Sequence, residues 1–228
     1  MNKQLDQKFD ELEGLTWYPW IGDEYFSANE NNRILIVGES HFLDDTKESI
    51  EKHNRKDFTR IVVKEIGIER NYYKTKIFPN FHKAIFGNDN FNSSAFWNSV
   101  SFYNFIQRPL SSKNTRPMTT DFREGWQNFF DVINIIKPRT CIFIGNSSAD
   151  HLGKEIKNST YRTDGIKWVE KIGRTYGKVG KIKGENGIET QLIFIRHTSA
   201  YFKCEEWNNF LNNQIPNEIE WLKSRLNQ

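Results

Sequence analysis

The chain has 228 residues, of which 37% are hydrophobic and 27% charged, and its formal net charge is +3. This length can bury one sizeable core, so we expect residues 1–228 to form a single domain. No uncharged apolar run approaches the ~20 residues that cross a bilayer, and the charged first residues lack the apolar region of a secretory signal. These features argue against a membrane protein or membrane partner and predict a soluble, cytoplasmic one.

The two cysteines argue against several kinds of site. Cys141 stands in an apolar run and Cys204 beside a glutamate, so they supply neither a disulfide framework nor the four thiolates of a structural zinc or iron–sulfur site. We therefore expect no metal and no cofactor. The pI near 8.7 is compatible with a nucleic-acid partner but also with an ordinary protein.

Four runs rich in apolar residues predict the strands of a sheet, at 33–38, 100–106, 140–145 and 191–196. The first is continuously apolar and ends in Gly38, which is typical of a strand buried on both faces of a parallel sheet. Between the second and third strands, apolar residues recur at helical spacing over 121–137, and this βαβ order implies parallel pairing. We therefore predict an α/β fold, a three-layer α/β/α sandwich around a central, mainly parallel, four-stranded sheet.

Further helices are expected on both sides of these strands, at 147–156 and 205–226, with two more in 56–86 around a break at Gly67. The 121–137 helix is expected to start with a capping box of Asp121 and Glu124. The segment 171–187 is rich in glycine and basic residues, which favours an exposed hairpin or loop.

Polar residues begin where the apolar strands stop. Ligands of open parallel sheets bind beyond the carboxyl ends of the strands, so these residues mark a candidate crevice. They are residues 38–42 after the first strand, Asn104 within the second, Asn146 after the third and 197–199 after the fourth.

Several of these segments resemble the uracil-DNA glycosylase superfamily, and they are nearest to its bacterial and archaeal iron–sulfur branch. The central block is FYNFIQRPL at 102–110, NTRPMT at 114–119, IKPRTCIFIG at 136–145 and SADHL at 148–152. Val37-Gly-Glu-Ser matches the first motif of the family, and His197-Thr-Ser-Ala matches its His-Pro-Ser motif, followed by a helix with an early tryptophan, Trp207. The matching segments run from about residue 33 to 226 in the family's order.

The resemblance implies a glycosylase-like domain that hydrolyses the N-glycosidic bond of a flipped uracil or modified base. It implies that Asn104 binds the base, His197 stabilises the base oxygen, Glu39 shapes the water site and Phe42 stacks on the base. The candidate catalytic residues are Glu39, Ser40, His41 and His197. The candidate substrate-binding residues are Gly38, Phe42, Asn104, Asn146 and Ser199.

This chain also departs from the family pattern. Gln107 and Arg108 stand where the iron–sulfur branch has its first cysteine, so no cluster is expected. Ser40 replaces the aspartate of the most active members, Thr198 replaces the usual proline, and His41 has no counterpart in the family.

A nucleic-acid partner would need cations for its phosphates. The expected partner is single- or double-stranded DNA, or a nucleobase or nucleotide, bound by a monomer. The candidate backbone contacts are Arg108, Lys113, Arg116, Arg174 and Lys178.

Two other functions stay open at this stage. One is a binding module for nucleic acid or nucleotides that keeps the glycosylase fold without its activity. The other is an esterase of the Gly-Asp-Ser type, with Ser40 as nucleophile and Asn146 as oxyanion donor. Those esterases place an aspartate three residues before the histidine, where this chain has Phe194.

Overall fold

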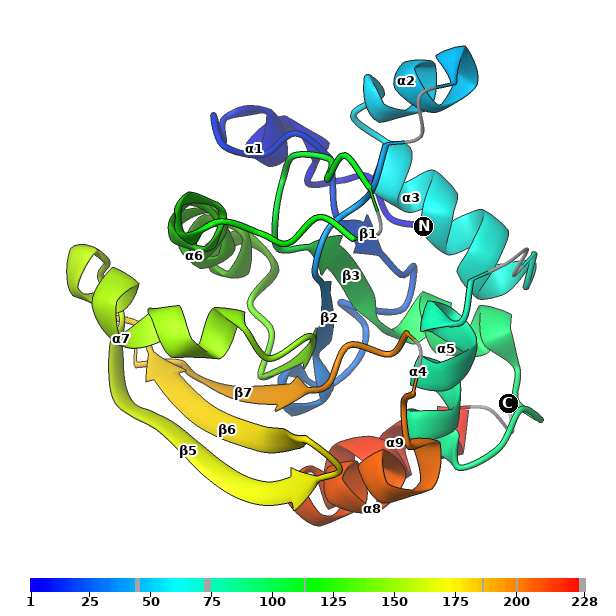
Figure 1. Ribbon diagram of the computed structural model, residues 1–228, viewed down its shortest axis with the longest axis vertical. Coiled ribbons are helices and arrows are strands. Elements are labelled where there is room, and N and C mark those ends of the chain that lie inside the picture. The colour runs from blue at the N-terminus through cyan, green and yellow to red at the C-terminus, as the bar shows by residue number, and fades with distance from the viewer. Residues whose placement is uncertain (44–45, 72–74, 113, 186, 200, 226–228) are drawn as a thin grey trace.

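The computed structural model describes residues 1–228 except 44–45, 72–74, 113, 186, 200 and 226–228. Its centre is one sheet in the order β1-β3-β2-β4-β7-β6-β5 (Figure 1). The strands are β1 (Trp20–Ile21), β2 (Ile34–Gly38), β3 (Ser101–Asn104), β4 (Thr140–Ile144), β5 (Arg162–Ile172), β6 (Thr175–Lys183) and β7 (Glu189–Ile195).

The four predicted strands form the parallel block of this sheet. β3, β2, β4 and β7 pair in parallel, so their carboxyl ends lie at one edge. β1 adds to β3 in antiparallel orientation, and the β5–β6 hairpin adds to β7 in the same way. The α/β class is therefore confirmed, and the prediction of a four-stranded sheet is wrong.

The three missed strands lack the apolar runs that identified the others. β1 has only two residues, too few to show a period. β5 is exposed along most of its length, since it is the last strand of the sheet. The basic segment at 171–187 contains the turn and the second strand of a hairpin whose first strand begins at Arg162, and this second strand is paired with β7 and partly buried rather than exposed as predicted.

Helices cover both faces of the sheet, and this gives three layers (Figure 1). One face packs against α1 (Asp6–Asp10), α6 (Thr119–Ile136) and a short helical run that includes α7 (Leu152–Glu155). The other packs against η2, α4, α5, α8 and α9, whose bounds are Val63–Ile68, Ile77–Phe86, Ser93–Ser99, Cys204–Gln214 and Pro216–Arg225. Within β2, Leu35 and Val37 belong to the first core and Ile34 and Ile36 to the second, because side chains alternate along a strand.

Three helix predictions need correction. The 205–226 segment forms two helices, because the first ends before Pro216, which starts the second. The 56–86 segment contains α3 (Phe58–Val62) and a π-helical turn, η2, before α4. Asp121 is the third residue of α6 rather than its cap: its carboxylate accepts the backbone N–H of Met118 at 2.7 Å.

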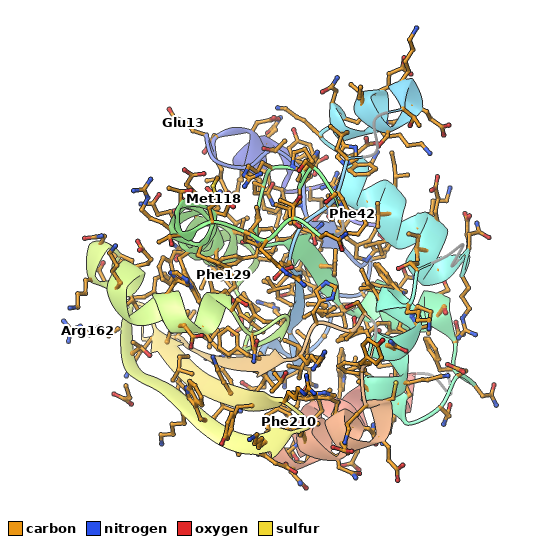
Figure 2. The ribbon with its side chains drawn as sticks, in the orientation of Figure 1. Glu13, Phe42, Met118, Phe129, Arg162 and Phe210 are labelled. Atoms are coloured by element: carbon orange, nitrogen blue, oxygen red, sulfur yellow. The ribbon has the colours of Figure 1, made fainter. Side chains whose placement is uncertain are left out.

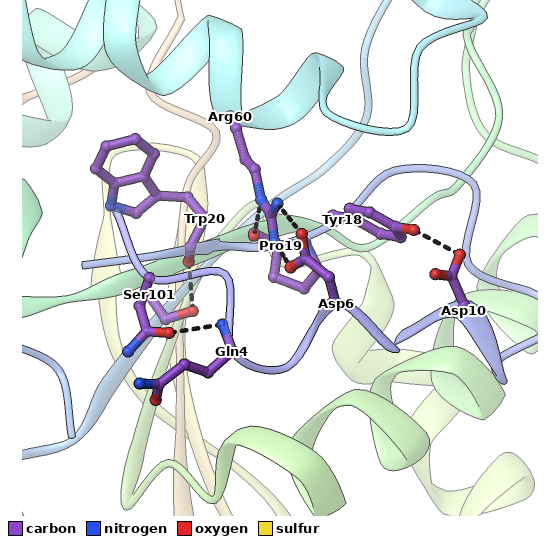
Figure 3. Close-up of polar contacts among 9 residues, drawn as sticks. Gln4, Asp6, Asp10, Tyr18, Pro19, Trp20, Arg60 and Ser101 are labelled. Atoms are coloured by element: carbon purple, nitrogen blue, oxygen red, sulfur yellow. Dashed lines mark hydrogen bonds and ion pairs between the residues drawn. The ribbon is translucent and has the colours of Figure 1, made fainter. Parts of the chain in front are cut away.

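The N-terminal segment is fixed to the domain through Arg60, whose side chain is only 4% exposed (Figure 3). Its guanidinium donates to the carbonyl of Pro19 at 2.9 Å and to both carboxylate oxygens of Asp6 at 2.9 and 2.6 Å. Next to it, the Ser101 hydroxyl donates to the carbonyl of Trp20 at 2.7 Å, which ties β1 to β3. None of the helices described is long and apolar enough to cross a membrane.

Candidate functional site

A cleft of about 560 Å³ lies beyond the carboxyl ends of β2 and β7. It is lined by the loop after β2, the loop after β7, the start of α4 and the loop before α6. The lining residues are Glu39, Ser40, Phe42, Thr75, Lys76, Ile77, Leu110, Ser112, Asn114, Thr115, Arg116, Arg196, His197 and Ser199.

Backbone hydrogen bonds hold the loop after β2 in place. Phe105 N donates to Gly38 O and Ile106 N to Glu39 O, both at 2.9 Å, and Leu110 N donates to His41 O at 2.8 Å. The parallel pairing of β2 with β3 therefore continues past the ends of both strands. This brings Glu39, Ser40 and Phe42 to the cleft, and Figure 2 shows Phe42 on this loop.

Glu39 is a partly buried carboxylate without a partner among the described residues. Its side chain makes no hydrogen bond or ion pair with any other residue that the structure describes. Burial raises the pKa of Glu39, and the positive charge of Arg116 acts in the opposite direction. Gly145, whose φ of +130° favours glycine, lies beside this carboxylate, and a Cβ there would be in ordinary contact with Glu39 Oε1 at 3.6 Å. The carboxylate is therefore free to accept a proton from a ligand or from water.

Asn104 of β3 pairs with Gly38 of β2, and its side chain lies over the glycine. A Cβ on Gly38 would be only 2.1 Å from Asn104 Oδ1, so the glycine makes the space that the amide occupies. Asn104 is 4% exposed, yet its side-chain amide has no hydrogen-bond partner within the described chain. Buried amides are normally hydrogen-bonded, so this one is suited to a ligand. Asn104 does not itself line the 560 Å³ cleft. It pairs with Gly38, and the residue directly after Gly38 is Glu39, which does line the cleft.

His197 is held at the cleft by its neighbour in the chain. The Thr198 hydroxyl, fully buried, donates to Ile77 O at 2.9 Å, and the Asn80 amide donates to Thr198 O at 2.8 Å. Burial lowers the pKa of His197 to about 4, with contributions from the positive charges of Arg116 and Arg196. The ring is therefore neutral near pH 7 and can donate one N–H without carrying charge.

Cations outnumber carboxylates among the lining residues of the cleft. Lys76, Arg116 and Arg196 line it together with a single carboxylate, that of Glu39. Arg116 is exposed and makes no ion pair or side-chain hydrogen bond with the described residues. The cleft therefore favours ligands that are negatively charged or become so during reaction.

His41 faces away from this cleft, although it too follows β2. Its Nε2 lies 2.9 Å from the Thr59 hydroxyl, and its ring packs against Trp17 and Phe58 at centroid distances of 4.9 and 4.5 Å. Burial lowers the pKa of His41 to about 3, and His53 adds to this effect. The geometry gives His41 a place in an aromatic cluster, so it is no longer a candidate catalytic residue.

Two of the cations predicted to contact the nucleic-acid backbone form ion pairs within the protein. Arg108 forms a bidentate ion pair with Asp121, at 2.6 Å for both contacts. Lys178 is 4% exposed, with its Nζ 2.6 Å from Asp150 Oδ1 and 4.7 Å from the ring centroid of Trp168. Each cation is thus paired with a carboxylate of the protein; the Lys178 side chain is buried, whereas that of Arg108 is 41% exposed.

The other candidates fall in different places. The Asn146 amide donates to Tyr176 O at 3.2 Å, and Asn146 does not line the cleft. Ser199 and Arg116 do line it, Arg174 lies in the turn of the β5–β6 hairpin, and Lys113 is outside the described residues.

Sequence reasoning missed two cations of the cleft. Arg196 ends a predicted strand, and its position directly before His197 is the signal that could have identified it. Lys76 carries no such signal, because the packing of α4 brings it to the cleft from a distant part of the chain.

No protein-family model matches the chain, and no curated protein matches it. Within the described residues, no three His, Cys, Asp or Glu side chains are grouped so that they could hold a metal ion. The cleft itself is therefore the basis for assigning a function. A neutral histidine and a partly buried carboxylate in a positive field, with an unpaired amide beside Gly38, suit hydrolysis with an anionic leaving group.

Proposed function

We propose that the chain binds nucleic acid at the cleft and hydrolyses the N-glycosidic bond of a flipped uracil or modified base. One observation carries the proposal: Glu39 and His197 line one cleft, Asn104 pairs with the residue directly before Glu39, and none of the three side chains has a hydrogen-bond partner in the described protein. Residues that proved structural, such as His41 and Arg108, have such partners. Unpaired polar groups at one crevice are the groups that a ligand would satisfy.

Each of these side chains has a role in the proposed reaction. Water attacks the sugar carbon C1′ as the bond from C1′ to the base nitrogen breaks and its electron pair leaves with the base. Glu39 accepts the proton of the water, a task suited to a carboxylate whose pKa is raised by burial. The neutral His197 donates an N–H to the base oxygen on which negative charge develops. The base is protonated after release.

Binding and charge stabilisation come from the remaining groups. The Asn104 amide can donate to and accept from the Watson–Crick edge of a base at once. Phe42 lines the cleft and offers a ring for stacking. Arg116 and Arg196 place positive charge near the leaving group. The motifs shared with uracil-DNA glycosylases support the same assignment, while Ser40, in place of their aspartate, leaves Glu39 as the carboxylate for water activation.

The esterase alternative gains no support from the geometry. It requires Asn146 as an oxyanion donor, but that amide is bound to Tyr176 O and lies outside the cleft. A binding module without activity has the same cleft as the enzyme, so the two are separated by experiment.

The test is base release, measured by mass spectrometry. Single- and double-stranded oligonucleotides would carry uracil, hypoxanthine, xanthine or an oxidised pyrimidine. We expect release by the wild type and its loss in Glu39→Gln, Asn104→Ala and His197→Ala, each still folded. His151→Ala, which removes a histidine stacked on Phe122 outside the cleft, is the matched control and should keep wild-type release.

The outcomes separate the enzyme from the binding module. Release that survives the substitutions of Glu39, Asn104 and His197 would refute the proposed roles. Salt-sensitive binding of the oligonucleotides without release of any base would establish the binding module instead.

A further inference from the structure

A second cavity, of about 520 Å³, adjoins the cleft on the side of the β5–β6 hairpin. It is lined by the end of β5, the hairpin turn, the end of β7 and the segment that leads into α8. The lining residues are Ile172, Gly173, Arg174, Arg196, Tyr201, Lys203 and Trp207. Arg196 lines both cavities, so they meet at its side chain.

Three cations surround this second cavity, and no carboxylate is among its lining residues. Lys203 Nζ contacts Glu206 Oε1 at 2.6 Å, and Arg196 Nη1 contacts the Thr175 hydroxyl at 3.4 Å. Arg174 is exposed, and its guanidinium has no ion pair or hydrogen bond to the described residues. Arg174 is therefore the cation of this cavity that is most available to an anion.

The floor of the cavity is apolar. Ile172 is 2% exposed and Trp207 is fully buried, with an indole N–H that has no hydrogen-bond partner in the described protein. The hairpin turn is close to the opposite wall, since a Cβ on Gly173 would lie 3.7 Å from the Lys203 side chain. The accessible ring at this cavity is that of Tyr201, which is 89% exposed. A ring for stacking beside cations fits a ligand that has a flat ring and a phosphate, and the volume is in the range of small-ligand sites.

We propose that the two cavities bind neighbouring nucleotides of one strand. The cleft holds the flipped base, and the second cavity holds the adjacent nucleotide, with the phosphate of that nucleotide on Arg174 and Arg196. This inference rests on the proposed function and adds a substrate requirement to it. A free nucleoside fills the cleft alone, whereas a strand occupies both cavities across Arg196. The protein therefore selects an oligonucleotide over a nucleoside or a mononucleotide.

The test is the binding of a short fluorescent single-stranded oligonucleotide, followed by anisotropy over a series of salt concentrations. We expect Arg174→Ala to weaken binding about tenfold at low salt and to reduce the slope of log K against log salt by about 0.7, the value for one lost phosphate contact on a single strand. Its thermal unfolding should match the wild type, because Arg174 is an exposed turn residue without a partner in the described protein.

The control is Arg162→Ala, which removes an exposed arginine from the start of the same hairpin. Figure 2 shows Arg162 at the end of β5 remote from Phe210 and α8. Both variants lose one positive charge, so only a local phosphate contact separates them. We expect Arg162→Ala to keep the wild-type affinity and salt slope.

Each outcome decides a different point. No oligonucleotide binding by the wild type would overturn the proposed function and this inference with it. Binding that is equal in the wild type and Arg174→Ala would overturn the inference alone and leave the function standing. Equal weakening in Arg174→Ala and Arg162→Ala would mean that only net charge matters, which also overturns the second cavity as a phosphate site.

Discussion

His82 offers a quantitative test of how this fold tolerates a buried imidazole. It is fully buried in α4, its ring lies 4.6 Å from that of Phe91, and neither ring nitrogen has a hydrogen-bond partner in the described protein. Burial, aided by the positive charge of Arg70, lowers the pKa of His82 to about 3 from its ordinary 6.5. Between these pH values the unfolded chain holds a proton on His82 that the folded chain does not.

The free energy of unfolding therefore falls as the pH drops below 6.5. Each pH unit removes about 1.4 kcal/mol, so between about pH 6.5 and pH 5 this histidine alone removes about 2 kcal/mol. Replacing it with leucine, which has a similar volume, also removes two unpaired polar atoms, a gain on the order of 1 kcal/mol. We expect His82→Leu to be more stable than the wild type by about 1 kcal/mol at about pH 7.5 and by about 3 kcal/mol at about pH 5.

Urea unfolding at the two pH values measures both differences. Phe81→Leu, a substitution at a buried position of the same helix, changes packing without removing a titratable group and should keep the wild-type dependence on pH. If His82→Leu lost as much stability between the two pH values as the wild type does, His82 would not be a buried neutral group in the folded chain.

Three further substitutions test the site and its support. Lys178→Met should change the free energy of urea unfolding by no more than about 1 kcal/mol, because the Asp150 carboxylate that it leaves is 57% exposed, and it should not change the salt slope of oligonucleotide binding; a changed slope would show that the lysine contacts phosphate. Gly38→Ala should lower the affinity for a base analogue, measured by calorimetry, because its Cβ would displace the Asn104 amide; unchanged affinity would count against Asn104 as a ligand. Thr198→Val should lower the free energy of unfolding by about 1 kcal/mol, because the hydrogen bond to Ile77 O is lost, and it should slow base release. Base release at the wild-type rate would show that this hydrogen bond does not position His197.

The parallel block was predictable because its strands are buried on both faces. β2 and β4 are buried at every position, and their short apolar runs have the length of a strand rather than that of a buried helix. β5 is a strand only through its pairing with β6, and its exposed, mixed composition is that of a loop. Strand formation that depends on a partner cannot be found in one segment alone.

The candidate site was predictable in its position but not in all its members. His41 and His197 both follow buried strands, yet one side chain turns toward Thr59 in α3 and the other into the cleft. Asp121 is 13 residues beyond Arg108, and Asp150 is 28 residues before Lys178. Only tertiary structure pairs those charges, so sequence could not separate the structural cations from Arg116.

The antiparallel additions to the sheet also bear on how the protein avoids self-association. β1 and β6 cover the two outer strands of the parallel block, so neither β3 nor β7 offers unpaired backbone groups to another molecule. Of the two edge strands of the whole sheet, β1 has only two residues, and β5 carries lysines and two irregularities in its register, at 163–166 and 168–170, features that disfavour pairing with a second sheet. Because Asp6 and Arg60 fix the segment that contains β1, their ion pair keeps one edge of the sheet closed to aggregation.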